Sequence, residues 1–321
     1  MNVKFGLVGL GYISKRFASA MKLVEGVELS TVASREQARS EEFAEKFGAK
    51  KAYDSYLDLI RDPAVDVVYI GLTHNFHLEI AKLCLQEHKA VLIEKPMVTT
   101  RSDAEELVAM AQANNTLLME ALWTRCQPAY LKAQEWVNSG CIGEPQLITA
   151  NYHHQVPYDP HNRFYDPKLA GGSLFDLGVY PIGFAIGLMG EAPIEVSGLA
   201  KISSTGVDQS AAWAMRFSNG GLANLSCGFS VDALEEAVIY GADGSLVLDQ
   251  SSGPKSCKHY NSQHQLIDSF VDLEEDGFVH QIRHCADLYR QGKIESNLIP
   301  WKDTIACAQV FDSLRKQWGL L

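Results

Sequence analysis

The first 121 residues alternate between two periods of apolar residues, and this alternation restricts the fold more than any other feature. Five short segments are apolar throughout and rich in β-branched residues: 3–8, 27–33, 65–72, 90–94 and 116–121. Four helical patterns separate them: 13–23, 36–47, 77–86 and 102–114. Strands that are apolar on both faces need helices above and below the sheet. The pattern therefore predicts an α/β domain with a doubly wound parallel sheet.

The pattern changes after residue 123. A predicted helix at 129–138 and a strand at 145–153 lead through a long polar loop to a helix at 173–189. Strands with turn signals but no helix between them follow: 194–202, 211–217, 222–229, 237–240 and 245–248. Helical periodicity returns at 278–290 and 303–317. We expect two domains, residues 1–123 and 124–321, the second an α+β domain with an open, mostly antiparallel sheet.

Composition narrows the class of protein. A chain of 321 residues with 46% hydrophobic and 21% charged residues can bury a large core. The formal charge of -11 opposes binding to nucleic acid, so a small-molecule partner is expected. Glycines interrupt the N-terminal apolar run, so we expect neither a signal peptide nor a membrane span there. We therefore expect a cytoplasmic protein. The 7 cysteines include no C-x-x-C pair, which favours buried reduced thiols over a disulfide framework or a thiolate metal site.

The segment "GLGYIS", Gly9 to Ser14, follows the first predicted strand and fits G-x-G-x-x-G except at Ser14. Gly9 permits a tight turn, and Gly11 lets backbone N–H groups approach a pyrophosphate. The helix that begins near Ile13 would turn its positive end toward that charge, and Tyr12 and Ile13 are candidate cofactor contacts. Ser14 is small enough to keep the helix close to the strand. A strand before the motif and a helix after it predict a nucleotide-binding loop, with an ordinary glycine-rich turn as the alternative.

The end of the second strand indicates which nucleotide is bound. An NAD site usually places a carboxylate here to accept the ribose hydroxyls. This chain has Ser34 and Arg35 instead. Arg35 can hold a 2′-phosphate through charge-assisted contacts, and Arg39, one helical turn later, can add to the same field. NADP is therefore expected over NAD, unless both arginines are solvated surface residues.

Three strand ends carry residues that a cofactor or substrate would meet, because ligands of open parallel sheets bind beyond the carboxyl ends of the strands. These ends are "GLTHNFH" at 71–77, "IEKP" at 93–96 and "EALWTR" at 120–125. The candidate contacts on them are Thr73, His74, Asn75, His77, Glu94, Lys95, Trp123 and Arg125. We expect His77 to be a structural histidine rather than a base, and Glu94 to hold the turn or the lysine in place.

Asp176 and Tyr180 are four residues apart on a predicted helix, so they project from one face. With Lys95 they offer an acid/base set. An ammonium near a phenol favours the phenolate, which can remove a hydroxyl proton while hydride leaves the same carbon. Alternatively, Asp176 caps or pairs locally and Tyr180 is a core aromatic residue.

Four segments, in this order and roughly at this spacing, resemble the Gfo/Idh/MocA oxidoreductases: "GLGYIS", "IEKPMV", "MEALWTR" and "DPKLAGGSLFDLGVYPI". The resemblance covers essentially the whole chain and is greatest to dimeric dihydrodiol dehydrogenases and NADP-dependent D-xylose dehydrogenases. It implies a Rossmann domain followed by a domain with an open mixed sheet. It also implies NAD(P)-dependent oxidation or reduction of a sugar or cyclic polyol, and dimerisation through the outer face of that sheet.

The same resemblance implies roles for single residues. Lys95 matches the active-site lysine, Asp176 the acidic residue and Tyr180 the proposed acid/base, where many relatives have His. Trp123 and Arg125 match a W-x-R segment: Trp123 can pack against the ring of a substrate, and Arg125 can pair with an Asp or with cofactor groups. Both can equally be structural. Relatives of the E-K-P motif are also similar in favouring a cis bond after the lysine.

The loop at 151–166 holds His153, His154 and His161, which raises the question of a metal site. Adjacent histidines on a strand point to opposite faces, so we expect no metal. A substrate-binding loop is the better interpretation, with Tyr158 and Phe164 lining the pocket.

Together these features predict an NADP(H)-dependent oxidoreductase in which Tyr180 moves a hydroxyl proton, Lys95 favours the phenolate and orients the substrate, and Asp176 positions that pair. Two alternatives stay open. One is a non-catalytic NAD(P)-binding regulator of the same fold, which would lack the lysine or its acid/base partner. The other is an NAD-assisted glycosidase, in which the cofactor is recycled.

Overall fold

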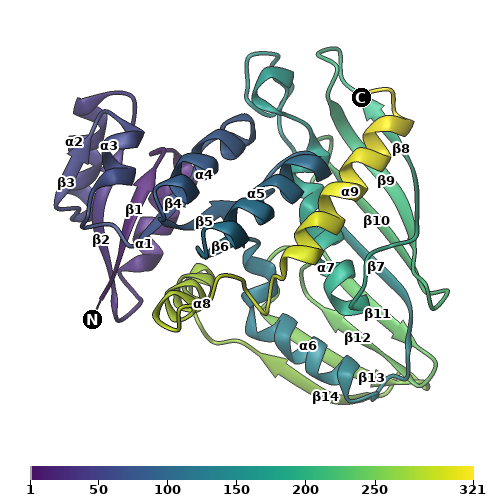
Figure 1. Ribbon diagram of the computed structural model, residues 1–321. Coiled ribbons are helices and arrows are strands. Elements are labelled where there is room, and N and C mark those ends of the chain that lie inside the picture. The colour runs from purple at the N-terminus through teal and green to yellow at the C-terminus, as the bar shows by residue number, and fades with distance from the viewer. Residues whose placement is uncertain (1) are drawn as a thin grey trace. The chain divides into compact units, whose positions relative to one another are not determined.

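The computed structural model describes residues 2–321, which divide into two compact units (Figure 1). The N-terminal unit comprises the chain up to Val98, Ser102–Ala121 and Asp276–Trp301. The C-terminal unit comprises Thr99–Arg101, Leu122–Glu275 and Lys302–Leu321. The predicted domain boundary after residue 123 lies close to Ala121, where the chain passes from the N-terminal to the C-terminal unit. Residues 276–301 were expected in the second domain but belong to the N-terminal unit.

The N-terminal unit contains a six-stranded parallel sheet in the order β3-β2-β1-β4-β5-β6. Its strands are β1 (Val3–Val8), β2 (Val27–Ala33), β3 (Lys51–Tyr53), β4 (Val67–Ile70), β5 (Ala90–Glu94) and β6 (Leu118–Ala121). Its helices are α1 (Tyr12–Met21), α2 (Gln37–Phe47), α3 (Tyr56–Arg61), α4 (His77–Gln86), α5 (Arg101–Ala113) and α8 (Phe278–Arg290), with a 3-10 turn, η1 (His74–Phe76). Every residue of β4 and β5 is buried. The predicted doubly wound sheet is confirmed.

The position of α8 explains why residues 276–301 return to the N-terminal unit. Helix α8 packs beside α1 and against β1. The guanidinium carbon of Arg16 lies 4.1 Å from the centroid of the Phe278 ring. The backbone of Ile294 accepts from Leu118 of β6, and the Trp301 indole donates to the Leu118 carbonyl at 2.8 Å. These contacts join a late part of the chain to the edge strand and to the first helix.

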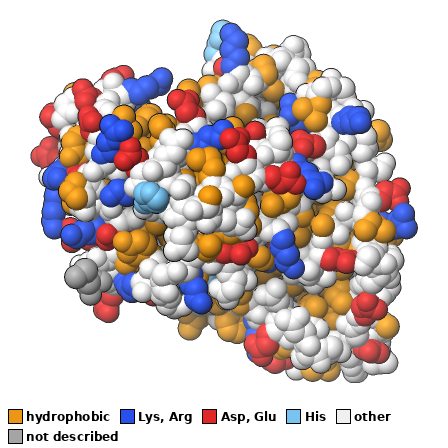
Figure 2. All heavy atoms as spheres, in the orientation of Figure 1, with side chains coloured by type: hydrophobic (Ala, Val, Ile, Leu, Met, Phe, Trp, Pro, Cys, Tyr) orange, Lys and Arg blue, Asp and Glu red, His pale blue; other side chains and the backbone are white. Residues whose placement is uncertain are grey.

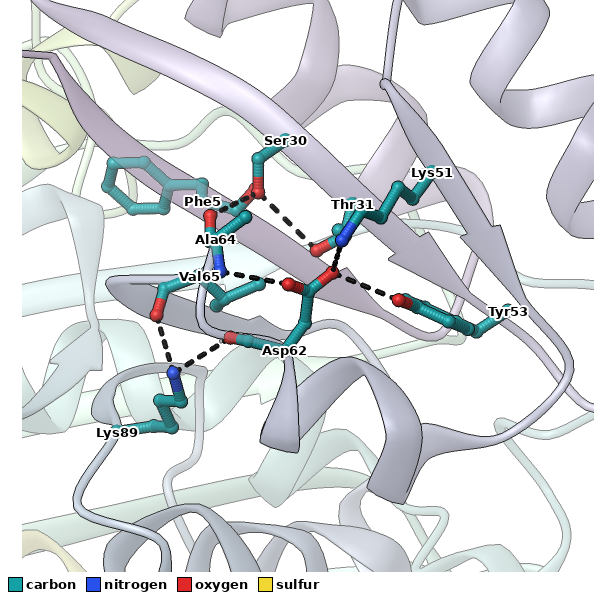
Figure 3. Close-up of polar contacts among 9 residues, drawn as sticks. All are labelled: Phe5, Ser30, Thr31, Lys51, Tyr53, Asp62, Ala64, Val65 and Lys89. Carbon is teal, nitrogen blue, oxygen red and sulfur yellow. Dashed lines mark hydrogen bonds and ion pairs between the residues drawn. The ribbon is translucent and has the colours of Figure 1, made fainter.

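A buried carboxylate, Asp62, fixes the turn between α3 and β4 (Figure 3). Its Oδ2 accepts from the Lys51 ammonium at 2.8 Å and from the Tyr53 hydroxyl at 3.0 Å, while Oδ1 accepts from the Ala64 N–H at 2.8 Å. The Lys89 ammonium donates to the carbonyls of Asp62 and Val65. The network thereby ties the short edge strand β3 to the amino end of the sheet.

Asp62→Asn should lower the free energy of unfolding by about 1–3 kcal/mol, because an amide N–H would face two donors. Burial disfavours the charged carboxylate, but the bonds from Lys51, Ala64 and Tyr53 outweigh it and lower the pKa of Asp62. The ionised group therefore contributes stability above the ordinary value of 3.8, and this contribution is lost as the pH falls through the lower folded pKa. Chemical denaturation at pH 7 and at pH 3 measures both effects.

Asp54→Asn, at an exposed aspartate near β3, is the matched control and should change stability little. A wild-type denaturation midpoint for Asp62→Asn at pH 7 would contradict the role assigned to the network.

The C-terminal unit contains an eight-stranded open sheet in the order β14-β13-β12-β11-β7-β10-β9-β8. Its strands are β7 (Pro145–His153), β8 (Glu195–Ile202), β9 (Asp208–Arg216), β10 (Leu222–Gly228), β11 (Ala237–Gly241), β12 (Gly244–Leu248), β13 (Ser256–Asn261) and β14 (Leu266–Val271). Strands β7 and β10 pair in parallel, and the other neighbours pair antiparallel. The mostly antiparallel sheet of an α+β domain is thus confirmed.

Helices cover one face of this sheet. They are α6 (Pro128–Asn138), α7 (Val179–Met189) and α9 (Trp301–Gln317), with 3-10 turns η2 (Trp123–Cys126) and η3 (Pro167–Leu169) and a π-helical turn η4 (Leu174–Gly178). Helix α6 packs on β12 to β14, and α7 and η4 pack on β7 and β10, as Figure 1 shows. The segment Pro167–Met189 is long and apolar enough to span a membrane, but 83% of its apolar 18-residue stretch is buried inside the protein. A core helix shows this combination.

The surface carries both signs of charge. On the face seen in Figure 2, acidic and basic side chains are interspersed among apolar ones, without a broad basic area. The seven cysteines are thiols, and all except Cys141 are buried.

Candidate active site

The glycine loop after β1 is shaped to receive an anion. Gly9 has a φ of +83°, and a Cβ there would lie 2.6 Å from the Leu72 side chain, so only glycine fits. Gly11 is the N-cap of α1, and no other atom lies within 4 Å of the place where its Cβ would be. It offers no side-chain acceptor to the first N–H groups of α1, whose first turn contains no acidic residue. These donors and the open space above Gly11 fit the pyrophosphate of a dinucleotide.

Ser14 takes the place of the third glycine of the motif. Its side chain is fully buried, and its hydroxyl donates to the Gly9 carbonyl at 2.5 Å, which closes the loop onto α1. Ile13 is half-buried, and Tyr12 is 82% exposed at the start of the helix. The structure thus places all the predicted loop residues around one helix end.

The three candidates at the turn after β2, which are Ser34, Arg35 and Arg39, differ in their contacts. Ser34 is buried and builds the turn, since its N–H donates to the Ser40 hydroxyl at 2.9 Å and its own hydroxyl donates to the Glu36 carbonyl at 2.8 Å. Arg39 donates to the Leu10 carbonyl at 3.0 Å, which fastens its guanidinium beside the glycine loop. Arg35 is exposed and, within residues 2–321, forms neither a hydrogen bond nor an ion pair. Its five donors are therefore available to an anionic ligand.

His77 connects the loops that follow β4 and β5. Its ring nitrogens lie 3.0 Å from the Pro96 carbonyl oxygen and 3.1 Å from that of Leu72. Burial lowers the pKa of this histidine, although the neighbouring backbone carbonyls oppose the shift. A fully buried ring between two loops, whose neutral form donates to one of the two carbonyls, favours the expected structural role.

Next to His77, the ring of His74 is nearly buried and meets the His77 ring edge-on at 5.7 Å. The Thr73 hydroxyl donates to the side-chain oxygen of Asn75 at 2.8 Å, which orders the turn after β4. All four candidates of this loop therefore lie at the carboxyl end of β4.

Lys95 stands on a turn that two buried carboxylates hold. The Lys95–Pro96 peptide bond is cis. Glu94 accepts from the Tyr69 hydroxyl at 2.7 Å, and Glu120 accepts from the Met97 N–H at 2.9 Å. The expectation that Glu94 holds the turn agrees with this geometry, whereas Glu120 was not among the predicted residues.

In the C-terminal unit, Asp176 and Tyr180 stand out because they are only partly buried. Between Gly172 and Leu188 they are the two residues that are not fully buried. Asp176 accepts from the Arg163 guanidinium at 3.2 Å, and the Tyr180 ring meets the Tyr152 ring edge-on at 5.5 Å. The sequence predicted one continuous α-helix here. Instead, the η4 turn precedes α7, so Asp176 sits on a wider turn, a feature frequent at functional sites.

Trp123 and Arg125 differ in their surroundings. Gly253 lies directly against the Trp123 indole, and the Thr124 hydroxyl donates to the Ser252 carbonyl. Arg125 is buried, pairs with Asp303 at 3.1 Å and donates to a backbone carbonyl of α7. Arg125 was expected to pair with an Asp or with cofactor groups, and the structure shows the pair with an Asp. Because this pairing occupies the guanidinium inside the C-terminal unit, it does not support the expected contact with a cofactor.

The polar loop before η4 places its predicted residues close to the strands. The Tyr158 hydroxyl bonds to Ser204, and the Phe164 ring meets the Phe229 ring at 5.4 Å. The same loop carries Arg163, the partner of Asp176, which was not among the predicted site residues.

The histidines of the loop have separate partners. His153 lies 2.9 Å from the Ser226 hydroxyl, and His154 lies 3.1 Å from Asp232. Within residues 2–321, no group of three or more His, Cys, Asp or Glu side chains could hold a metal ion.

Both parts of the chain match models of one protein family. Residues 3–122 match a model described as an oxidoreductase family with an NAD-binding Rossmann fold, and residues 130–247 match the Gfo/Idh/MocA C-terminal domain. A trans-1,2-dihydrobenzene-1,2-diol dehydrogenase of Mus musculus is 30% identical over 329 residues, which cover 100% of this chain and 98% of that protein. The chain belongs to the Gfo/Idh/MocA oxidoreductase family. The resemblance seen in the four motifs is confirmed, as is the class of NAD(P)-dependent oxidoreductase.

Another relative and two solved structures match this chain over nearly its full length. The Homo sapiens protein of the same name as the mouse relative is 30% identical over 332 residues, covering 100% of this chain and 98% of that protein. KijD10, a 3-ketoreductase of Actinomadura kijaniata solved with NADP and TDP-benzene, is 25% identical, with a TM-score of 0.86 and 98% coverage of both chains. The aldose-aldose oxidoreductase of Caulobacter crescentus, 21% identical, shows the same fold with a TM-score of 0.90 over 99% of this chain and 98% of that one.

Proposed function

We propose that the chain is an NADP(H)-dependent oxidoreductase acting on a carbinol or carbonyl carbon of a sugar, cyclic polyol or trans-dihydrodiol. The observation that carries the proposal is that, between Gly172 and Leu188, Asp176 and Tyr180 are the two residues that stay partly exposed. The names of the relatives support the substrate class, since the mouse and human proteins are dihydrodiol dehydrogenases. The glycine loop and Lys95 supply the other parts that such a reaction needs.

Each residue has one task in this proposal. The Tyr180 phenolate removes the hydroxyl proton during oxidation and returns it during reduction. The Lys95 ammonium favours the phenolate and orients the substrate oxygen. Asp176, held by Arg163, positions that pair. Bound nicotinamide would accept or supply the hydride.

The preference for NADP is proposed from the turn after β2. Arg35→Ser should raise KM for NADP about 10- to 100-fold, because charge-assisted bonds to the 2′-phosphate are lost, and should leave KM for NAD nearly unchanged. Initial rates with both cofactors give the ratio. Arg61→Ser, at a surface arginine paired with Glu87, is the control. An unchanged ratio for Arg35→Ser would show that NADP is recognised elsewhere.

A spectrophotometric screen tests the whole proposal. D-xylose, other aldoses, polyols and trans-1,2-dihydrobenzene-1,2-diol are offered with NADP and with NAD in parallel, and NADPH should form with at least one of them. Product formation without net change in nicotinamide absorbance would instead indicate the NAD-assisted glycosidase. Cofactor binding without any turnover would indicate a regulator.

The proposal extends to assembly and location. A cytoplasmic homodimer through the outer face of the C-terminal sheet agrees with the buried thiols and with the exposure of Leu199 and Leu222 on that face.

A further inference from the structure

Asp208 is a buried carboxylate at the first residue of β9 that binds the turn carrying Asp176. It is 3% exposed. Its Oδ2 accepts from the Ser173 hydroxyl at 2.7 Å and from the Leu174 N–H at 2.6 Å. Leu174 is the first residue of η4, so the carboxylate binds the helical segment where it begins. Ser173 occupies the N-cap position, but its hydroxyl serves as a donor to Asp208. The acceptor that a helix start needs therefore comes from a distant strand.

The backbone before η4 is shaped to admit this carboxylate. Gly172 has a φ of +122°, which L side chains rarely adopt, and a Cβ there would collide with Oδ1 of Asp208. The absence of a side chain at Gly172 lets the backbone approach within hydrogen-bond distance of a buried acid. The contact between Asp208 and the turn thus depends on the acid at position 208 and on the glycine at position 172.

The charge of Asp208 is retained at a cost to stability. Burial raises the pKa of Asp208 from 3.8 to about 6, although the bonds from Ser173 and Leu174 and the nearby Arg315 favour the carboxylate. The folded protein therefore binds this proton more tightly than the unfolded chain does. Ionised Asp208 costs stability above pH 6, and that cost disappears as the pH falls through 6 toward 4.

The groups around Asp208 do not reverse this conclusion. Arg315 of α9 is half-buried and also interacts with Asp312. The Cys227 thiol of β10 has a pKa raised first by burial and then by Asp208 and Asp176, so it stays neutral. Asp208 lies next to the turn that carries Asp176 and lowers stability when it is charged. A buried acid of this kind is more readily explained by a role in function than by a role in folding.

We propose that Asp208 is a positioning residue: as a carboxylate it holds the start of η4 and so fixes the direction in which Asp176 and Tyr180 project. This inference rests on the proposed function of those two side chains. Charge-assisted hydrogen bonds are about twice as strong as neutral ones, so protonation of Asp208 loosens the turn without abolishing it.

The first test needs no substrate. Hydrogen exchange followed by mass spectrometry on peptides that span 172–182 reports the Leu174 N–H and its neighbours. Asp208→Ala removes the acceptor and should accelerate exchange in this segment roughly tenfold or more, while peptides of β1 and β2 stay as in wild type. Asp208→Asn keeps the shape and one acceptor oxygen, and should give a smaller acceleration. Wild-type exchange of 172–182 in both variants would overturn the proposal.

The second test uses turnover of NADP with D-xylose or trans-1,2-dihydrobenzene-1,2-diol. Asp208→Asn should lower kcat roughly five- to tenfold at pH 8, with KM for NADP unchanged, because a neutral amide holds the turn less firmly. The ratio of wild-type to Asp208→Asn kcat should fall toward one at pH 5, where Asp208 is also neutral. Titration of other catalytic groups cancels in this ratio. If the ratio of wild-type to Asp208→Asn kcat stayed constant across pH, and the variant differed from wild type only by a lower stability, the proposal would be overturned.

Glu191→Gln is the matched control. Glu191 lies just beyond the C-terminal end of α7. Like Asp208, it accepts from a backbone N–H and a serine hydroxyl, both of which belong to Ser218. Its substitution should leave kcat and its pH dependence as in wild type. The two proposals fail separately: full turnover by Tyr180→Phe overturns the proposed function, whereas wild-type exchange in the Asp208 variants overturns only the positioning role.

Discussion

Tyr180→Phe is expected to lower kcat by about 10²- to 10⁴-fold, the usual contribution of a positioned general acid or base. The substitution removes one oxygen and keeps the ring that packs edge-on against Tyr152, so the local structure should persist. Binding of NADPH, measured by the change in its fluorescence on titration, should stay close to wild type. The loss should therefore appear in turnover rather than in cofactor affinity.

Tyr130→Phe is the control for this variant. The Tyr130 hydroxyl donates to the Phe184 carbonyl of α7, and the side chain is fully buried. Its loss perturbs the same helix without touching the proposed reacting group, so stability should fall while kcat stays near wild type. Equal losses in both variants would mean that disturbance of α7, not a missing acid/base group, explains the effect of Tyr180→Phe.

Lys95→Met is expected to lower kcat by about 10²- to 10³-fold, because the ammonium acts on charge that develops during the reaction. Methionine preserves most of the length and apolar volume of the side chain. Glu94 and Glu120 would still hold the turn through Tyr69 and the Met97 N–H. NADPH affinity should again change little, and single-turnover kinetics should show a slowed chemical step.

Lys89→Met, at the other end of β5, is the matched control. Lys89 donates to two backbone carbonyls, of Asp62 and Val65, and its loss should lower stability without slowing turnover. If Lys95→Met turned over at the rate of Lys89→Met, the lysine of the E-K-P turn would have no role in chemistry.

The sequence predicted the strands of the N-terminal sheet where apolar runs were long enough to form a pattern. The predicted bounds of β1, β2 and β5 agree with the structure residue for residue. Strand β3 was missed, because it has only 3 residues and carries a lysine at the sheet edge. Strands β13 and β14 were missed because polar residues interrupt them, and β14 is largely exposed. Edge strands are defined by their partners more than by their own sequence.

The candidate site was predictable as a set of motifs, but not in its supporting contacts. A spacing of four residues placed Asp176 and Tyr180 on one predicted helix, yet it could not distinguish a π-helical turn from an α-helical one. That distinction is made by tertiary contacts near Gly172 and Asp208, which lie 36 positions apart by their numbers. Arg163 and Glu120 were missed for the same reason: their significance lies in a partner that sequence distance hides.

The return of residues 276–301 to the N-terminal unit has a consequence for the order of folding. Helix α8 covers α1 and β1, and the segment after it binds the edge strand β6. During synthesis, the sheet and the glycine loop precede the helix that completes their cover by more than 100 residues, most of which belong to the C-terminal unit. The N-terminal unit therefore stays incomplete while residues 122–275 are synthesised, and until α8 arrives the α1 surface that it covers is exposed.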